Sequence, residues 1–370
     1  MPDRTARLPR PPGLPPGTLR LPPDADAPSI HVFGYGPDEF EELEVVDAAQ
    51  LAAVRGRWPN VWINVNGLGS GERLRALGEA FGIHPLVVED LSTPHQRPKV
   101  EQYPGHLYVV LRMLRWDADD HGLVGEQLNL VLGPDFVLTI QEMPGDPFDP
   151  VRDRLRNPQR QVRRTGVDFL AYAIIDAIVD HCFPMLEEFG DRLDDLESAV
   201  LARPTKDTLA RIKEARRTLI RLRRAVWPMR DAVAALQGEH IALIAPETRP
   251  YLRDVFDHSL RVLDIAESYR EQVGGLMDGY LSAISFRMNE VMGLLTLVGA
   301  VFLPLSFLTG LYGMNFDPAS PWNMPELKNP FGYPILLFVM ITSGAAMVWF
   351  FKKRGWFEFV ALSKQLGDDD

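Results

Sequence analysis

Two long apolar runs lie near the C-terminus, whereas polar and apolar positions are interspersed through the preceding chain. The first run, Val291 to Phe316, has 26 residues without a charge, and the second, Asn329 to Phe351, has 23. Each exceeds the roughly 20 residues that a helix needs to cross the hydrocarbon core of a bilayer. The loop between them is short, and its charged residues are Asp317, Glu326 and Lys328. The pattern therefore predicts two membrane spans joined by a turn on one side of a membrane.

The distribution of positive charge predicts the orientation of these spans. Lys352, Lys353 and Arg354 directly follow the second span, whereas the connecting loop has a single lysine. Positively charged residues stay cytoplasmic, so the tail and, two spans earlier, residues 1–290 are expected in the cytosol. This predicts a multi-pass protein of the cell inner membrane with both termini cytoplasmic. The alternative is a pair of buried core helices in a soluble protein, which is disfavoured because long uncharged core helices are rare.

Residues 30–149 are predicted to form a cytosolic α/β domain around a sheet. Short β-branched or aromatic runs bounded by Gly, Pro, Asn or Asp predict strands; they are IHVFGY, NVWINVN, HLYVVLRML, EQLNLVLG and DFVLTIQE. Helices are predicted from Ser70 to Phe81 and from Leu86 to Ser92, and the strand order is not predicted. The GLGSG stretch at 67–71 fits a glycine-rich turn better than a nucleotide loop, because Glu72 occupies the place of the third glycine in GxGxxG.

Residues 150–249 are predicted to form a cytosolic helical hairpin. Val167 to Leu201 and Lys206 to Trp227 have the apolar spacing of helices. The first is rich in acidic residues and the second in basic ones, which favours an antiparallel pair with complementary faces. The alternative for the basic helix is attraction to anionic headgroups or to cations elsewhere in an assembly.

A long helix is predicted next, since no proline occurs between Pro250 and Pro304 and helical spacing continues into the first span. About 55 helical residues would be roughly 80 Å long. The predicted segments are the stalk helix and first span (250–312), an external loop (313–333), the second span (334–351) and a basic, then acidic, cytosolic tail (352–370). The proline-rich leader, residues 1–29, is expected to be disordered.

Composition excludes several classes of protein. A net charge of −11 argues against nucleic acid as a partner and makes cations plausible ones. The single cysteine, Cys182, excludes a disulfide scaffold and a cysteine-rich metal site. The chain has no phosphate-binding loop, zinc-hydrolase motif or nucleophile elbow. We therefore expect neither an enzyme nor an ATP-driven machine.

Steps of three and four residues along the predicted long helix define a polar stripe. It consists of Asp278, Ser282, Ser285, Asn289, Met292, Thr296, Gly299, Leu303, Ser306, Gly310 and Gly313. Polar groups within a span usually face a bundle interior or a water-filled cavity, so the stripe predicts a pore lined by several copies of this helix. One two-span chain cannot enclose a channel, so a pore requires a homo-oligomer. The alternative is close helix packing, with Ser and Thr hydroxyls bonded to their own backbone.

Several motifs together resemble the CorA family of magnesium transport proteins. They are YGMNF at 312–316, MPEL at 324–327, GYP at 332–334, HPLVVED at 84–90, HQRPKV at 95–100, YLRDVFDH at 251–258 and NEVM at 289–292. The resemblance covers roughly residues 30–360, and the position of GMN between two C-terminal spans makes it specific. MPEL favours the magnesium and cobalt members over the related zinc-transporting branch.

The resemblance implies an α+β membrane protein that forms a funnel-shaped homopentamer, with a cytosolic α/β domain, a long stalk helix and two C-terminal transmembrane helices. Gly313, Met314 and Asn315 would form the pore entrance, with Glu326 in the adjoining loop. A ring of Asn315 amides can hydrogen-bond the water shell of Mg²⁺ without replacing it, and weakly enough for the ion to leave. The pore-lining residues would be Asp278, Asn289, Met292, Thr296, Gly299, Leu303, Ser306 and Gly310.

The resemblance also implies that Mg²⁺ bound between cytosolic domains closes the pore. The matching residues are Asp90 of one subunit and Asp254 of its neighbour, with Glu89 and Asp176 as a second cluster. Carboxylates that face each other repel, and a divalent ion between them reverses the sign of the interaction. Loss of that ion would let the subunits separate and the pore widen.

Three functions remain open from the sequence. The first is passive transport of Mg²⁺, extending to Co²⁺ and Ni²⁺, driven by a membrane potential that supplies about 2.3 kcal/mol per charge per 100 mV. The second is a Zn²⁺ transporter of the same fold. The third is a membrane-tethered scaffold or sensor, which predicts no ion flux.

Overall fold

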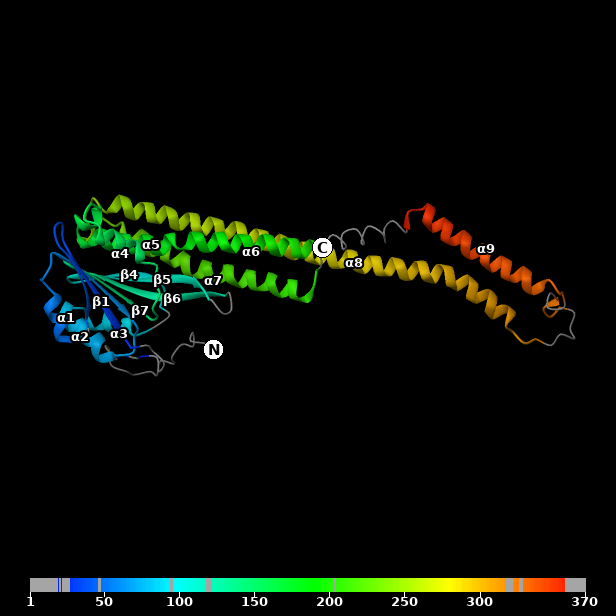
Figure 1. Ribbon diagram of the computed structural model, residues 1–370, viewed down its shortest axis with the longest axis horizontal. Helices are drawn as coiled ribbons and strands as arrows, with labels where there is room; N and C mark the ends of the chain where they lie inside the picture. Colours follow the sequence, from blue (N-terminus) through cyan, green and yellow to red (C-terminus); the bar gives the residue numbers. More distant parts are fainter. Residues whose placement is uncertain are drawn as a thin grey trace. The chain divides into compact units, whose positions relative to one another are not determined.

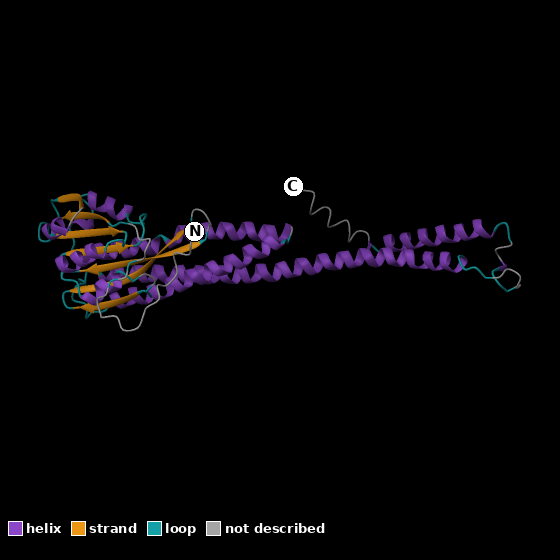
Figure 2. Cartoon of the chain, turned by 90° about the horizontal axis from the view of Figure 1, so that it is seen from below, coloured by secondary structure: helices purple, strands orange, loops and turns teal. Residues whose placement is uncertain are grey.

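The chain divides into two compact units in the computed structural model (Figures 1 and 2). The sheet unit contains Met1–Leu193 and Lys213–Val273, and the apolar unit contains Asp194–Ile212 and Gly274–Asp370. The structure describes residues 19, 21, 27–45, 48–93, 96–117, 122–202, 204–316, 322–325 and 329–356. Most of the leader, Glu326 and the tail after residue 356 lie outside the described residues.

The sheet unit is built on a seven-stranded sheet with the order β2-β1-β3-β7-β6-β5-β4. The strands are β1 Ser29–Tyr35, β2 Phe40–Val45, β3 Asn60–Asn66, β4 Lys99–Tyr103, β5 His106–Trp116, β6 Leu123–Leu132 and β7 Phe136–Gln141. β3 and β7 pair in parallel, and the other neighbours in this sheet are antiparallel. The five predicted strands are confirmed. The unpredicted strands, β2 and β4, are the two edges, where charged and half-exposed residues replace the apolar run.

Helices cover both faces of this sheet (Figure 1). On one face, α1 Ala48–Val54, α2 Gly71–Phe81 and α3 Pro85–Leu91 pack on side chains such as Ile63 of β3. The next residue back, Trp62, enters the core on the opposite face, as the alternation of side chains along a strand requires. Leu19 and Leu21, within the leader expected to be disordered, pack against the core of the first face.

The second face is covered by α4 Asp149–Arg156, the short 3₁₀-helix Gln161–Arg163, α5 Val167–Asp180, and parts of α6 Cys182–Ala202, α7 Lys206–Leu236 and α8 Arg249–Tyr312.

The single helix expected from Val167 to Leu201 is interrupted at His181, three residues before Pro184, which lacks the N–H that a continuous helix would use. The helix expected to end at Trp227 instead continues through Pro228 to Leu236. Its basic side chains pair with Glu214 of the same helix and with Glu267 of α8.

Three helical stretches are long and apolar enough to cross a membrane: Val167–Ala202, Arg249–Tyr312 and Gly332–Lys353, the last of which is α9. In the first, 67% of the most apolar window is buried inside the chain, so α5 and α6 serve as core helices. The corresponding windows of α8 and α9 are 6% and 0% buried. Their apolar surfaces have little protein cover within the described chain, which is the surface expected of two membrane-spanning helices.

The start of α8 is tied to α5 by one carboxylate. Asp168, in the first turn of α5, is 9% exposed. Its Oδ2 accepts hydrogen bonds from Thr248 Oγ1 at 2.6 Å and from the Ala245 backbone N–H at 3.0 Å. Both donors lie in the turn immediately before α8. The first turn of the long helix is therefore fixed against α5 within the sheet unit.

Replacement of this carboxylate by Asp168→Ala should lower the thermal unfolding midpoint of the purified protein. The variant leaves one buried and one half-buried donor unpaired, which corresponds to about 2–3 kcal/mol. Asp153→Ala is the matched control, because Asp153 forms an ion pair with Arg156 while its side chain is 73% exposed. Equal midpoints for the two variants would contradict the anchoring role of Asp168.

Candidate ion pathway and divalent-cation site

The polar stripe lies on an uncovered face of α8 in the single chain. Asp278, Asn289, Thr296 and Ser306 are all exposed, and the apolar members Met292 and Leu303 are 58% and 71% exposed. The less exposed positions of the same stretch, Leu297, Val301, Pro304 and Leu308, lie about a third of a turn away around the helix. A Cβ built on Gly344 of α9 would be 3.8 Å from Leu305 Cδ1. α9 therefore approaches a face of α8 other than the stripe.

Two hydroxyls of the stripe bond to the backbone of their own helix. Ser285 Oγ donates to the Leu281 carbonyl at 2.9 Å, and Thr296 Oγ1 donates to the Met292 carbonyl at 2.8 Å. This is the geometry expected for close helix packing. The same oxygens keep their lone pairs free to accept hydrogen bonds from water, so the geometry is compatible with a pore as well.

The GMN tripeptide follows the last turn of α8. The Gly313 N–H donates to the Thr309 carbonyl at 2.9 Å, and the Met314 N–H donates to the Leu311 carbonyl at 3.3 Å. A Cβ on Gly313 would lie 3.0 Å from the Thr309 carbonyl oxygen, so glycine allows the chain to leave the helix there without a clash. Met314 and Asn315 are exposed. The amide of Asn315 is therefore available at the end of the stripe.

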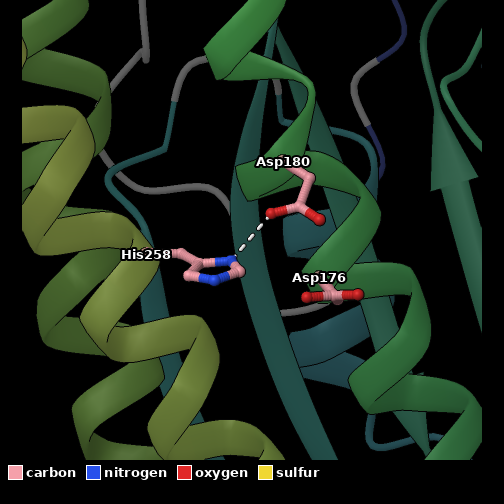
Figure 3. A group of neighbouring side chains, drawn as sticks. All are labelled: Asp176, Asp180 and His258. Atoms are coloured by element: carbon pink, nitrogen blue, oxygen red, sulfur yellow. Dashed lines mark hydrogen bonds and ion pairs between the residues drawn. The ribbon is translucent and has the colours of Figure 1, made fainter.

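A second group of polar residues lies in the sheet unit, between α5 and α8. Asp176, Asp180 and His258 each offer a ligand atom, and these three atoms lie within 4.8 Å of one another (Figure 3). His258 Nδ1 is 2.8 Å from Asp180 Oδ1, and His258 Nε2 is 3.8 Å from Asp254 Oδ2. Two carboxylates and an imidazole form a ligand set that suits Co²⁺, Ni²⁺ or Zn²⁺ better than Mg²⁺, which prefers oxygen alone.

The electrostatics of this group favour a bound cation. Burial, and then the neighbouring charge of Asp180, raises the pKa of Asp176 to about 6, while Arg154 and His258 act in the opposite direction. Two neighbouring carboxylates, one of them buried, are unfavourable when both are ionised. A divalent ion between the carboxylates would remove this repulsion.

The remaining predicted ligands have other partners within the chain. Asp90 Oδ2 is 2.7 Å from Lys99 Nζ, which is also 2.8 Å from Glu101 Oε1. Burial lowers the pKa of Lys99, but its hydrogen bonds to both carboxylates outweigh this effect and raise the pKa. Among the described residues Glu89 is not part of the group around Asp176. The predicted pairing of Glu89 with Asp176 remains a prediction, as does a contact between Asp90 and Asp254 of another copy.

The sequence analysis assigned Asp176 and Asp254 but missed Asp180 and His258. The signal that could have found them is the repeated spacing of four residues, Asp176 to Asp180 and Asp254 to His258. Residues four apart share a helix face. Two such pairs, on helices that pack together, converge on one point.

Residues 60–353 match the family described as CorA-like Mg²⁺ transporter protein. The chain belongs to this family. The cobalt/magnesium transport protein CorA of Thermotoga maritima is 42% identical over 348 residues, which cover 93% of this chain and 97% of that protein. The zinc transport protein ZntB of Yersinia pseudotuberculosis is 24% identical over 275 residues, with coverage of 74% and 81%.

The CorA-like fold is also found by structural comparison. The complete structure of the CorA magnesium transporter from Methanocaldococcus jannaschii matches with a TM-score of 0.75 at 22% identity, covering 88% of this chain and 98% of that chain. At this identity the match shows the fold alone. It confirms the predicted combination of an α/β unit, a long helix and apolar C-terminal helices.

For this CorA family member, Co²⁺ should raise the thermal unfolding midpoint of EDTA-treated protein. A ligand that binds only the folded state stabilises that state by about 2.7 kcal/mol when its concentration is 100 times its dissociation constant. His258→Gln and Asp180→Asn should reduce this rise, and they should affect Co²⁺ more than Mg²⁺. The rise should also shrink as the pH falls below about 6, because protonation of Asp176 then competes with the metal.

Asp257→Asn is the control for this measurement, because Asp257 is exposed and next to His258 in the sequence but is not in the group. A Co²⁺ effect that is the same in wild type, His258→Gln and Asp180→Asn would show that the ion binds elsewhere.

Proposed function

We propose that the chain forms a homopentameric, channel-like transporter that carries Mg²⁺, and also Co²⁺ and Ni²⁺, passively across the cell inner membrane, with both termini in the cytoplasm. The observation that carries this proposal is the exposed polar stripe of α8, which ends at Gly313, Met314 and Asn315. A face that carries Asn289, Thr296 and Ser306 is unfavourable against lipid. Copies of α8 arranged around an axis would enclose this face and line a pore with it.

The chemistry of the stripe suits a hydrated divalent ion. Asn315 at the entrance and Asn289 deeper in the pore offer neutral amides, which hydrogen-bond the water shell of Mg²⁺ without the tight binding of carboxylates. Mg²⁺ loses its waters reluctantly, so recognition of the intact shell avoids a large dehydration barrier. Asp278 supplies negative charge toward the cytosolic end, and Met292 and Leu303 supply apolar constrictions.

The membrane potential is a sufficient energy source. An inside-negative potential favours entry of a divalent ion by roughly 4.6 kcal/mol per 100 mV. Because every 1.4 kcal/mol corresponds to a factor of ten, this supports more than a thousandfold accumulation. No nucleotide is required.

Asn315→Ala should abolish most Mg²⁺ uptake into proteoliposomes with an inside-negative potential, because the variant removes the amide ring while keeping the helix end formed by Gly313. Asn157→Ala is a matched control, since Asn157 is an exposed residue of the sheet unit. Zn²⁺ is measured in parallel because a zinc transport protein is among the relatives. Uptake of Zn²⁺ alone would favour the zinc transporter, and no uptake of either ion would favour the tethered scaffold.

Gating by cytosolic Mg²⁺ is the second part of the proposal. Asp90 would meet Asp254 of the neighbouring subunit, and Asp176 would contribute to a further ion site with Glu89. The ion pair between Lys99 and Asp90 adds a competing cation: a divalent ion must displace the ammonium group of Lys99 from the carboxylate before it can bind. Lys99 would therefore set the Mg²⁺ concentration at which the pore closes.

Lys99→Gln should lower the internal Mg²⁺ concentration that half-inhibits uptake by about fivefold, because a positive charge at contact distance from Asp90 contributes about 1 kcal/mol. Arg97→Gln is the control, since Arg97 is exposed and its nearest described carboxylate, Asp231, is 3.9 Å away. An unchanged or increased half-inhibiting concentration in Lys99→Gln would contradict the role of Asp90 in gating.

A further inference from the structure

A cavity of about 370 Å³ lies between α8 and the residues that follow α9, within the apolar unit. Its lining includes Glu290, Gly293, Leu294 and Leu297 from α8, and Arg354 and Trp356 after α9. This volume falls within the range of small-molecule sites, about 300–1,000 Å³. None of its lining residues belongs to the polar stripe or to the group around His258.

The two charged groups of the cavity are not paired with each other. Glu290 Oε1 is buried and has no hydrogen-bond partner among the described residues. The guanidinium group of Arg354 is exposed and lies 5.4 Å from the ring centroid of Phe350. Within the described chain no ion pair of 4.0 Å or less joins Arg354 to Glu290. An occupant with a cationic donor at one end and an anion at the other would satisfy both groups.

The position of the cavity along the chain indicates its depth in a bilayer. Glu290 is the last charged residue before the first uncharged run, and Lys352–Arg354 are the first charged residues after the second. Both positions are at the end of the hairpin opposite the connecting loop, where hydrocarbon gives way to headgroups. Trp349 and Trp356 lie on either side of Lys352–Arg354 in the sequence. Lys353 Nζ lies 5.1 Å from the Trp349 ring centroid. Tryptophan and basic residues are typical of the membrane interface.

We propose that this cavity binds a phosphatidylethanolamine headgroup from the cytoplasmic leaflet. The primary ammonium donates hydrogen bonds to the Glu290 carboxylate, the phosphate accepts from Arg354, and the first acyl carbons lie along Leu294 and Leu297. Charge-assisted hydrogen bonds of this kind are the strong ones. Phosphatidylcholine offers no N–H donor, and phosphatidylglycerol offers no cation to the carboxylate. The lipid site depends on α8 and α9 lying in a bilayer, and not on which ion the chain transports.

The test is native mass spectrometry of the purified full-length protein with an equimolar mixture of phosphatidylethanolamine, phosphatidylcholine and phosphatidylglycerol. Wild type should retain phosphatidylethanolamine over phosphatidylcholine by about tenfold, the equivalent of one charge-assisted hydrogen bond. Glu290→Gln should reduce this ratio to near one. Arg354→Gln should weaken retention of both lipids together, because they share the phosphate.

Glu271→Gln and Lys352→Gln serve as controls, since both residues are exposed and outside the cavity; both variants should retain the wild-type ratio. Equal retention of phosphatidylethanolamine and phosphatidylcholine by wild type would overturn the proposal, as would a preference for phosphatidylglycerol or an unchanged ratio in Glu290→Gln. A gain in lipid retention on deletion of residues 357–370 would assign the cavity to the chain's own tail and would also overturn it.

Discussion

The absence of water in the hydrocarbon core of a membrane is the constraint on which this structure depends. Backbone groups there must be satisfied within the segment, which leaves the helix as the form available to a single span. α8 meets this requirement by continuing as one helix from Arg249 to Tyr312. Its side chains are less well suited to lipid, because the polar residues Asn289, Thr296 and Ser306 are exposed in the single chain. The proposed assembly of several copies around an axis would enclose these polar side chains away from lipid.

The same constraint separates the three apolar helical stretches. α5 and α6 are apolar enough to be candidates for a span, yet two thirds of their most apolar window is buried against the sheet unit. α8 and α9 bury almost none of theirs. Length and hydropathy therefore select all three stretches as candidate spans, and burial by the rest of the protein distinguishes the core helices from the spans. The acidic residues of α6, such as Glu187 and Asp191, are consistent with this difference, because a span could not expose them to lipid.

The central strands of the sheet were predictable because both of their faces are buried, which produces runs such as NVWINVN. β2 and β4 were not, because an edge strand has fewer neighbours and accepts charged residues such as Glu42 or Lys99. Asp176 and Asp254 were predicted only because the family resemblance implied them, and the contacts of His258 with Asp180 and Asp254 depend on the packing of α5 against α8. The ion pair of Asp90 with Lys99 could not be predicted either, since it requires the end of α3 to lie beside β4.

The residues proposed for transport and for regulation differ in the strength with which they can hold an ion. Asn315 and Asn289 are neutral, exposed and able to contact a water shell only, so an ion that they recognise can leave rapidly. Asp176 is buried, His258 is half-buried and Asp180 is exposed, and their ligand atoms are close enough to one another to contact one ion directly. A regulatory ion would need such direct ligands, because it must stay bound longer than an ion in transit. Strong ligands in the pore would stop conduction, and weak ligands in the sheet unit would leave the repulsion between Asp176 and Asp180 uncompensated. Under the proposed function, neutral amides therefore belong in the pore, and the carboxylate and imidazole ligands belong between α5 and α8 in the sheet unit.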